Sequence, residues 1–190
     1  MIVGFLGVKQ SGKDTSADFM VKRFNFEKMH FAQPIKEACA ILFNFNEKQL
    51  YGDLKEEDDS FWKVSPRVVM QYLGTDVFRK DIQKIIPGIG DSFWVNVLIK
   101  KYQDKLKENS NCKIVIADVR FQNEIDTIHT LGGIVIKIVR ASVNSVDIHE
   151  SEKNIENLQG DYLINNDGSL EDLYNKLENI VSFIELKKLD

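Results

Sequence analysis

The N-terminal segment contains a glycine-rich loop with the spacing of a phosphate-binding loop. Gly7, Gly12 and Lys13 match the pattern G-x-x-x-x-G-K, between an apolar run at residues 2–6 and an amphipathic stretch at residues 15–24. This strand–loop–helix order is the context in which the pattern binds nucleotides. The glycines let successive backbone N–H groups point at phosphate oxygens, and the helix N-terminus adds its positive end. We expect Lys13 to bridge the β- and γ-phosphates of ATP.

The position after Lys13 departs from the usual form of this pattern. A Ser or Thr hydroxyl commonly ligates Mg²⁺ there, whereas this chain has Asp14 followed by Thr15. A carboxylate is a good hard ligand for Mg²⁺, but it also repels phosphate. Asp14 and Thr15 are therefore alternative ligands for the metal, and the sequence predicts ATP and Mg²⁺ as cofactors.

A second group of charged residues follows the apolar run at residues 114–117. Asp118 comes directly after this run, Arg120 lies two residues further on, and Glu124 falls in the first turn of the next predicted helix. Ligands of open parallel sheets bind beyond the carboxyl ends of the strands, so Asp118 is a candidate metal ligand and Arg120 a candidate clamp on the transferred phosphoryl group. Glu124 is expected to position Arg120. A purely structural Asp–Arg ion pair is the alternative.

The helix predicted from Ser65 presents a polar face. At about 100° per residue, one side of this helix carries Arg67, Gln71, Gly74 and Thr75. The opposite side carries Val69, Met70, Leu73 and Val77. A glycine inside a helix costs about 1 kcal/mol relative to alanine, and close approach by a ligand would account for it. We expect an acceptor pocket here, completed by Arg79 and by Trp94 stacking on a base; a solvated polar face is the alternative.

Arg140 ends another buried run, at residues 134–139, and is a candidate contact to the adenine or the phosphates of ATP. The polar stretch that follows has little periodicity. We interpret residues 141–160 as a candidate lid that closes over ATP and excludes water.

Composition and charge argue against several classes of function. The 190 residues carry a net charge of −4, so no global positive field attracts a polymeric nucleic acid. Cys39 and Cys112 match no metal-ligand spacing and are expected to be reduced, packed thiols. No run is long enough for a membrane span, and the N-terminus lacks the features of a signal peptide. These observations predict a cytoplasmic protein without a membrane partner.

The sequence pattern predicts a single α/β domain over residues 1–190. Strands are predicted at residues 2–6, 28–32, 114–117, 134–139 and 161–165. Helices are predicted at residues 15–24, 35–43, 65–84, 92–107, 121–131 and 169–186. Strands that alternate with helices predict a five-stranded parallel sheet with helices on both faces. The acidic stretch at 46–60 is expected to form a solvated helix or a flap.

Five segments in order resemble the bacteriophage-type deoxynucleoside monophosphate kinases, in the P-loop nucleotide kinase superfamily. They are residues 7–15 (GVKQSGKDT), 65–79 (SPRVVMQYLGTDVFR), 118–124 (DVRFQNE), 132–140 and 166–170 (NDGSL). The likeness runs from end to end, although the acidic stretch 46–62 matches poorly. The R-x-x-x-Q-x-x-G-T helix is the most discriminating of these pieces.

The resemblance implies a three-layer, adenylate-kinase-like fold and a nucleoside monophosphate acceptor, with the acceptor-binding helices at about residues 34–107. Carried over by position, Ser11, Lys13, Asp14 and Thr15 would hold ATP and the metal. Asp118, Arg120 and Glu124 would serve transfer. The acceptor site would comprise Arg67, Gln71, Gly74, Thr75 and Trp94, with Lys9 nearby. The resemblance leaves open whether the protein forms a homodimer.

Two alternative functions are weighed against this one. A phosphomevalonate-kinase-like enzyme would share the GKD loop and the D-x-R element, but the helix with Gln71, Gly74 and Thr75 belongs to the nucleotide group. A nucleotide-dependent switch would need a D-x-x-G motif at a strand end, which this sequence lacks.

Overall fold

The computed structural model describes residues 1–141 and 155–187. The chain forms two compact units: Met1–His30 with Gln103–Asp190, and Phe31–Tyr102. The candidate lid, residues 141–160, falls largely on residues 142–154, which lie outside the described residues.

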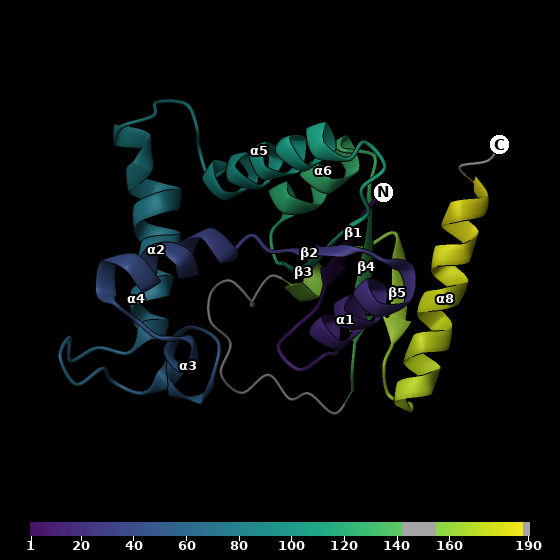
Figure 1. Cartoon of the computed structure of the whole chain (residues 1–190), viewed down its shortest axis with the longest axis horizontal. Helices are drawn as coiled ribbons and strands as arrows, with labels where there is room; N and C mark the ends of the chain where they lie inside the picture. Colours follow the sequence, from purple (N-terminus) through teal and green to yellow (C-terminus); the bar gives the residue numbers. More distant parts are fainter. Residues whose placement is uncertain (142–154, 188–190) are drawn as a thin grey trace. The chain divides into compact units, whose positions relative to one another are not determined.

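The first unit contains the predicted sheet of five parallel strands. They are β1 (Ile2–Leu6), β2 (Glu27–Met29), β3 (Ile114–Val119), β4 (Ile134–Val139) and β5 (Tyr162–Asn165). Their order is β2-β3-β1-β4-β5, and every neighbouring pair is parallel (Figure 1). All five residues of the central strand β1 are buried, as expected for a parallel strand covered on both faces.

Helices cover both faces of this sheet. Val3 and Phe5 of β1 point into a core shared with α1 (Lys13–Phe24) and α8 (Leu170–Lys187). Gly4, between them, faces the other way: a Cβ added there would lie 2.5 Å from Ile128 of α6 (Gln122–Thr130). This period-two alternation separates two helical layers, so the predicted three-layer α/β architecture is confirmed.

The second unit is helical. It contains α2 (Gln33–Phe43), α3 (Glu47–Leu50), η1 (Asp53–Glu56) and the start of α5 (Phe93–Glu108). Asn46 caps α3 reciprocally with Gln49: the Asn46 side chain accepts from the Gln49 N–H at 3.1 Å, and the Gln49 side chain accepts from the Asn46 N–H at 3.0 Å. The acidic stretch at 46–60 thus contains two short helices, neither one continuous helix nor an unstructured flap.

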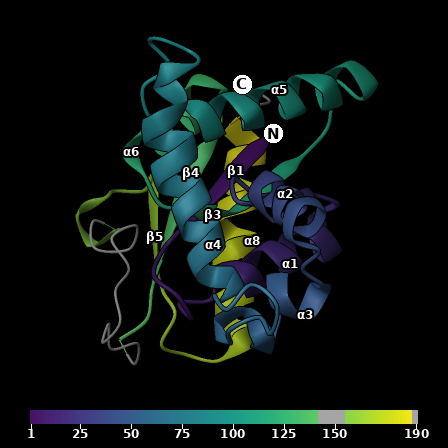
Figure 2. The ribbon, with the colours of Figure 1, turned by 90° about the vertical axis from the view of Figure 1, so that its left-hand side faces the viewer.

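The segment predicted as one helix over residues 65–84 contains three types of helix. Ser65 caps α4 (Pro66–Tyr72), which passes into a π-helix, η2 (Leu73–Lys80), and then into a 3₁₀-helix, η3 (Asp81–Lys84). Figure 2 shows them as one continuous column. The predicted limits are right, but the spacing of 100° per residue ends at Tyr72, because a π-helix hydrogen-bonds from i to i+5. The predicted polar face therefore cannot be extended by helical phase from Arg67 to Gly74 and Thr75.

No helix in the described ranges is long and apolar enough to cross a lipid bilayer. Both cysteines are free thiols, as predicted, and both are buried. Burial raises the pKa of the Cys39 thiol to about 11.

This burial predicts that neither thiol reacts in the folded protein. At pH 8 Cys39 stays protonated, because its pKa lies well above that pH, and the thiolate is the reactive form. We expect no release of thionitrobenzoate from Ellman's reagent in native buffer and two equivalents in 6 M guanidinium chloride. Rapid labelling of the native protein would contradict this prediction.

Candidate active site

The strand register brings several loops to one edge of the first unit. Leu6, the last residue of β1, pairs with Val119 of β3 on one side and with Lys137 of β4 on the other. Val139 at the end of β4 pairs with Asn165 at the end of β5. The segments that leave these ends begin with Gly7, Arg120, Arg140 and Asn166. Residues far apart in the sequence therefore meet where parallel sheets bind their ligands.

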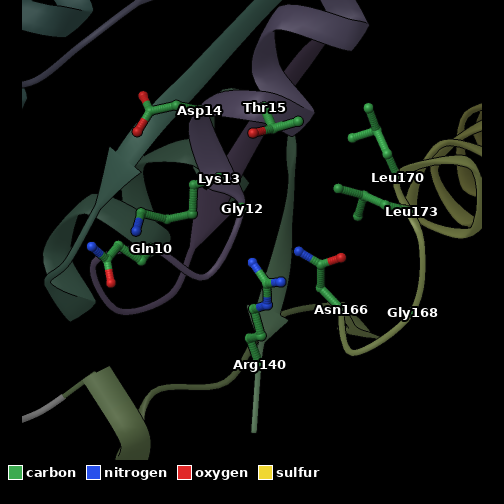
Figure 3. Close-up of a pocket in the computed structure, with 10 residues that line it drawn as sticks. All are labelled: Gln10, Gly12, Lys13, Asp14, Thr15, Arg140, Asn166, Gly168, Leu170 and Leu173. Carbon is green, nitrogen blue, oxygen red and sulfur yellow. The ribbon is translucent and has the colours of Figure 1, made fainter. Parts of the chain in front are cut away.

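A cavity of about 270 Å³ opens at this edge (Figure 3). It is lined by Gln10, Gly12, Lys13, Asp14, Thr15, Arg140, Asn166, Gly168, Leu170 and Leu173. The Lys13 and Arg140 side chains bring two cations to it, while Leu170 and Leu173 form an apolar wall. Half of this lining, from Gly12 to Thr15 together with Arg140, was predicted as a cofactor site. The arrangement suits a ligand with an anionic and an apolar part.

The phosphate-binding loop is tightly packed. Gly12 has φ 109°, a conformation that favours glycine, and it precedes the first residue of α1. Lys13 is buried, and its ammonium group donates a hydrogen bond of 2.6 Å to the Val8 carbonyl across the loop. Ser11 is fully buried, and its hydroxyl has no partner among the described residues. Both backbone groups of Ser11 are engaged, since its N–H donates to the Val8 carbonyl at 3.2 Å and its carbonyl accepts from the Asn166 side chain at 2.8 Å.

The candidate metal ligands lie in two elements, the first turn of α1 and the strand β3. Asp14 and Thr15 are exposed and line the cavity, so both stay candidates. Asp118 lies inside β3, next to its last residue, and not after the strand as predicted. The Nδ1 atom of His30, which follows β2, lies 3.9 Å from an Asp118 carboxylate oxygen, and the sequence did not single out this histidine.

No preformed metal cage is present in the described ranges: no three His, Cys, Asp or Glu side chains gather there. Mg²⁺ in phosphoryl-transfer sites is usually held by one or two carboxylates together with substrate phosphates, so this donor set fits Mg²⁺.

Glu124 supports the backbone of Arg120. Its carboxylate accepts hydrogen bonds from the Arg120 N–H at 2.8 Å and from the Phe121 N–H at 3.3 Å. Glu124 is 2% exposed, although it is an acidic residue, and it lies in the first turn of α6. The carboxylate therefore holds the turn between β3 and α6 that contains Arg120.

The predicted acceptor residues lie in the second unit, apart from the exposed Lys9 in the phosphate-binding loop of the first. Arg67 pairs with Glu56 of η1 at 2.9 Å, and Arg79 donates to the Asp91 carbonyl at 3.2 Å. Gln71, Gly74 and Thr75 are half-buried. A Cβ added at Gly74 would meet nothing within 4 Å.

Trp94 is 7% exposed and packs on Phe78 and Phe93. Its indole N–H donates a hydrogen bond of 2.8 Å to the Gly74 carbonyl in the π-helix. In this arrangement the tryptophan supports the segment around Gly74, and little of its ring is open for the predicted stacking on a base.

Sequence reasoning missed half of the cavity lining. The missed residues are Gln10, Asn166, Gly168, Leu170 and Leu173. The signal for Asn166 was present: it directly follows the last predicted strand, as Asp118 follows an earlier apolar run, and both belong to the carboxyl edge of the sheet.

Comparison with known proteins identifies the family. The family model for deoxynucleotide monophosphate kinase matches residues 1–62 and 54–177. A protein of Acanthamoeba polyphaga mimivirus is 35% identical over 181 residues, which cover 93% of this chain and 94% of the relative. The chain belongs to the deoxynucleotide monophosphate kinase family. The predicted resemblance is confirmed, and the phosphomevalonate-kinase-like and switch alternatives are not favoured.

Deoxynucleotide monophosphate kinase of Enterobacteria phage T4 is 27% identical, with 94% of this chain and 97% of the phage enzyme covered. That alignment is 244 residues long, so the phage enzyme carries segments that this 190-residue family member lacks. Among solved structures, dephospho-CoA kinase from Campylobacter jejuni has a TM-score of 0.55 at 16% identity, with 98% of each chain covered. This last likeness shows the fold.

The buried carboxylate of Glu124 generates a prediction about stability. Glu124→Ala leaves the Arg120 and Phe121 N–H groups without their acceptor, so the free energy of unfolding should fall by roughly 2–4 kcal/mol. Urea denaturation followed by circular dichroism measures this change. Gln122→Ala, on the exposed face of the same turn, is the matched control and should change stability by less than about 0.5 kcal/mol. Equal effects of the two substitutions would refute the capping role.

Proposed function

We propose that this kinase transfers the γ-phosphate of ATP to a deoxynucleoside monophosphate, giving ADP and a deoxynucleoside diphosphate. The observation that carries the proposal is the cavity at the carboxyl edge of the sheet, where Lys13 and Arg140 flank the phosphate-binding loop. Positioning and charge neutralisation suffice for such a transfer, and no covalent enzyme intermediate is needed.

In this proposal ATP occupies that cavity. The Gly12–Thr15 backbone at the start of α1 receives the phosphates, and Lys13 leaves the Val8 carbonyl to neutralise charge on the transferred group. Arg140 contacts a phosphate or the base, and Leu170 and Leu173 give the base an apolar wall. Close packing between Gly7 and Ser11 keeps the loop in shape, since a Cβ added to Gly7 would lie 2.6 Å from the Ser11 hydroxyl.

Mg²⁺ would be held by Asp14 or Thr15 together with Asp118, directly or through water. When bound, the ion would supply positive charge that offsets the negative charge developing during transfer. Arg120 is proposed to clamp the transferred phosphoryl group, and Glu124 acts through it by holding its backbone.

The acceptor is proposed to bind residues of the second unit. Arg67 would bind its phosphate in exchange for Glu56, because a carboxylate and a phosphate compete for the same guanidinium group. Gln71, Thr75 and Arg79 would supply further polar contacts. Lys9, in the phosphate-binding loop of the first unit, stays a predicted contact of the acceptor. Trp94 supports this segment through the Gly74 carbonyl. The relatives described above come from viruses, and we propose that this kinase likewise acts in the cytoplasm of a host cell.

A coupled assay of ADP release tests the reaction. We expect ATP- and Mg²⁺-dependent turnover with at least one of the four deoxynucleoside monophosphates. Lys13→Ala should lower kcat by roughly 10²–10³-fold, since it removes a cation directed at the transferred group. Lys22→Ala, an exposed lysine on the same helix, is the control and should leave kcat unchanged. If none of the four acceptors causes ADP release, the proposal is wrong.

Gly74 provides a test of the acceptor site. Because an added Cβ meets nothing within 4 Å, Gly74→Ala should leave the melting temperature unchanged or slightly raised. A ligand that approaches the bare backbone would collide with the new methyl group, so we expect the KM for the acceptor to rise about tenfold while the KM for ATP stays within about twofold. Unchanged kinetics for both substrates would exclude Gly74 from the site.

A further inference from the structure

Asn166 connects the end of β5 to the phosphate-binding loop. It is only 9% exposed and directly follows the last residue of β5. Its side-chain amide donates a buried hydrogen bond of 2.8 Å to the Ser11 carbonyl, 155 residues away in the chain. Its backbone N–H donates a hydrogen bond of 2.8 Å to the Val139 carbonyl at the end of β4. Main chain and side chain together therefore fix this residue between the sheet and the loop.

The amide also packs directly on Gly12. A Cβ added to Gly12 would lie 2.4 Å from the Asn166 Nδ2 atom, which is closer than a real Cβ contact. A side chain at position 12 would therefore displace the Asn166 amide. Figure 3 shows the amide nitrogen of Asn166 turned toward the phosphate-binding loop. The glycine and the asparagine are thus matched in shape, although the G-x-x-x-x-G-K pattern contains only one of them.

This contact determines which way a peptide group of the loop points. The peptide between Ser11 and Gly12 is planar and trans, so its carbonyl and its N–H point in opposite directions. Asn166 binds the carbonyl, and the N–H of Gly12 is consequently directed away from Asn166. That N–H has no hydrogen-bond partner within residues 1–141 and 155–187, and Gly12 lines the cavity. An unpartnered N–H next to a helix N-terminus favours an anionic ligand.

We infer that Asn166 is a positioning residue for phosphoryl transfer: it holds the Ser11–Gly12 peptide with the N–H available to a phosphate of ATP. Without this donor the peptide is free to rotate and present its carbonyl oxygen, which repels phosphate. The inference rests on the proposed function, because it assigns ATP to this cavity. Asn166 itself acts through the loop and not on the reacting atoms.

Asn166→Asp tests the inference with an almost isosteric change. The carboxylate cannot donate to the Ser11 carbonyl and repels it, so we expect the KM for ATP to rise at least about tenfold, with the KM for the acceptor within about twofold of wild type. Asn165→Asp is the matched control, since it adds the same charge one residue away on an exposed side chain. It should leave both KM values within about twofold.

An equal rise in the KM for ATP in both variants, or none in Asn166→Asp, would overturn the inference while leaving the proposed function intact. A purely structural role would lower the melting temperature without separating the two KM values, and would overturn it as well.

A measurement on the unmodified protein covers the case in which Asn166→Asp does not fold. In ¹⁵N-labelled wild type, titration with ADP should move the Gly12 amide proton strongly downfield, because a charge-assisted hydrogen bond to phosphate forms there. An unmoved Gly12 resonance, with other loop amides shifted, would contradict the inference. Nucleotide binding without transfer to any deoxynucleoside monophosphate would instead count against the proposed function alone.

Discussion

The parallel arrangement of the five strands is the constraint on which the rest of the first unit depends. Because every strand runs in the same direction, the chain leaves β1, β3, β4 and β5 at the same edge of the sheet. The central strands β1 and β3 are buried at all but one of their residues, so the polar groups around them collect in the loops. The sheet therefore separates the molecule's stability, which comes from its apolar interior, from its chemistry, which is placed at one edge.

The phosphate-binding loop shows what this placement demands of the backbone. It includes a glycine at φ 109°, a fully buried serine hydroxyl without a partner in the described ranges, and a lysine that donates to a carbonyl of its own loop. Such features lower the stability of a loop and persist only where the surrounding structure holds them. Here that support comes from the sheet, through the ends of β4 and β5. A rigid scaffold and a strained loop are complementary parts of the same site.

The segment from Pro66 to Lys84 shows where sequence reasoning failed and why. Its limits were predictable, because Ser65 and Pro66 form a local helix start. The change from α- to π-helix at Leu73 was not, since both forms bury apolar residues on one side and differ in which carbonyl each N–H reaches. Trp94, twenty residues away, bonds to the Gly74 carbonyl and packs on Phe78 in this segment. Contacts of this kind are not encoded in the periodicity of the segment itself.

By itself the sequence determined the number of strands, their order along the chain and the phosphate-binding loop, because these depend on local spacing: Gly7, Gly12 and Lys13 lie within seven residues, between a strand and a helix. The family also followed from the sequence, through motifs spread over the whole chain. Only the tertiary structure decided what surrounds that loop. Strand register aligns β4 and β5 with β1 and so brings to the cavity Arg140, which the sequence predicted as a contact to ATP, together with Asn166, which it did not. The structure also shows how Glu124 is linked to Arg120: it accepts a hydrogen bond from the Arg120 backbone N–H. Pairing between strands is a long-range interaction, and a single sequence carries no local signal for it.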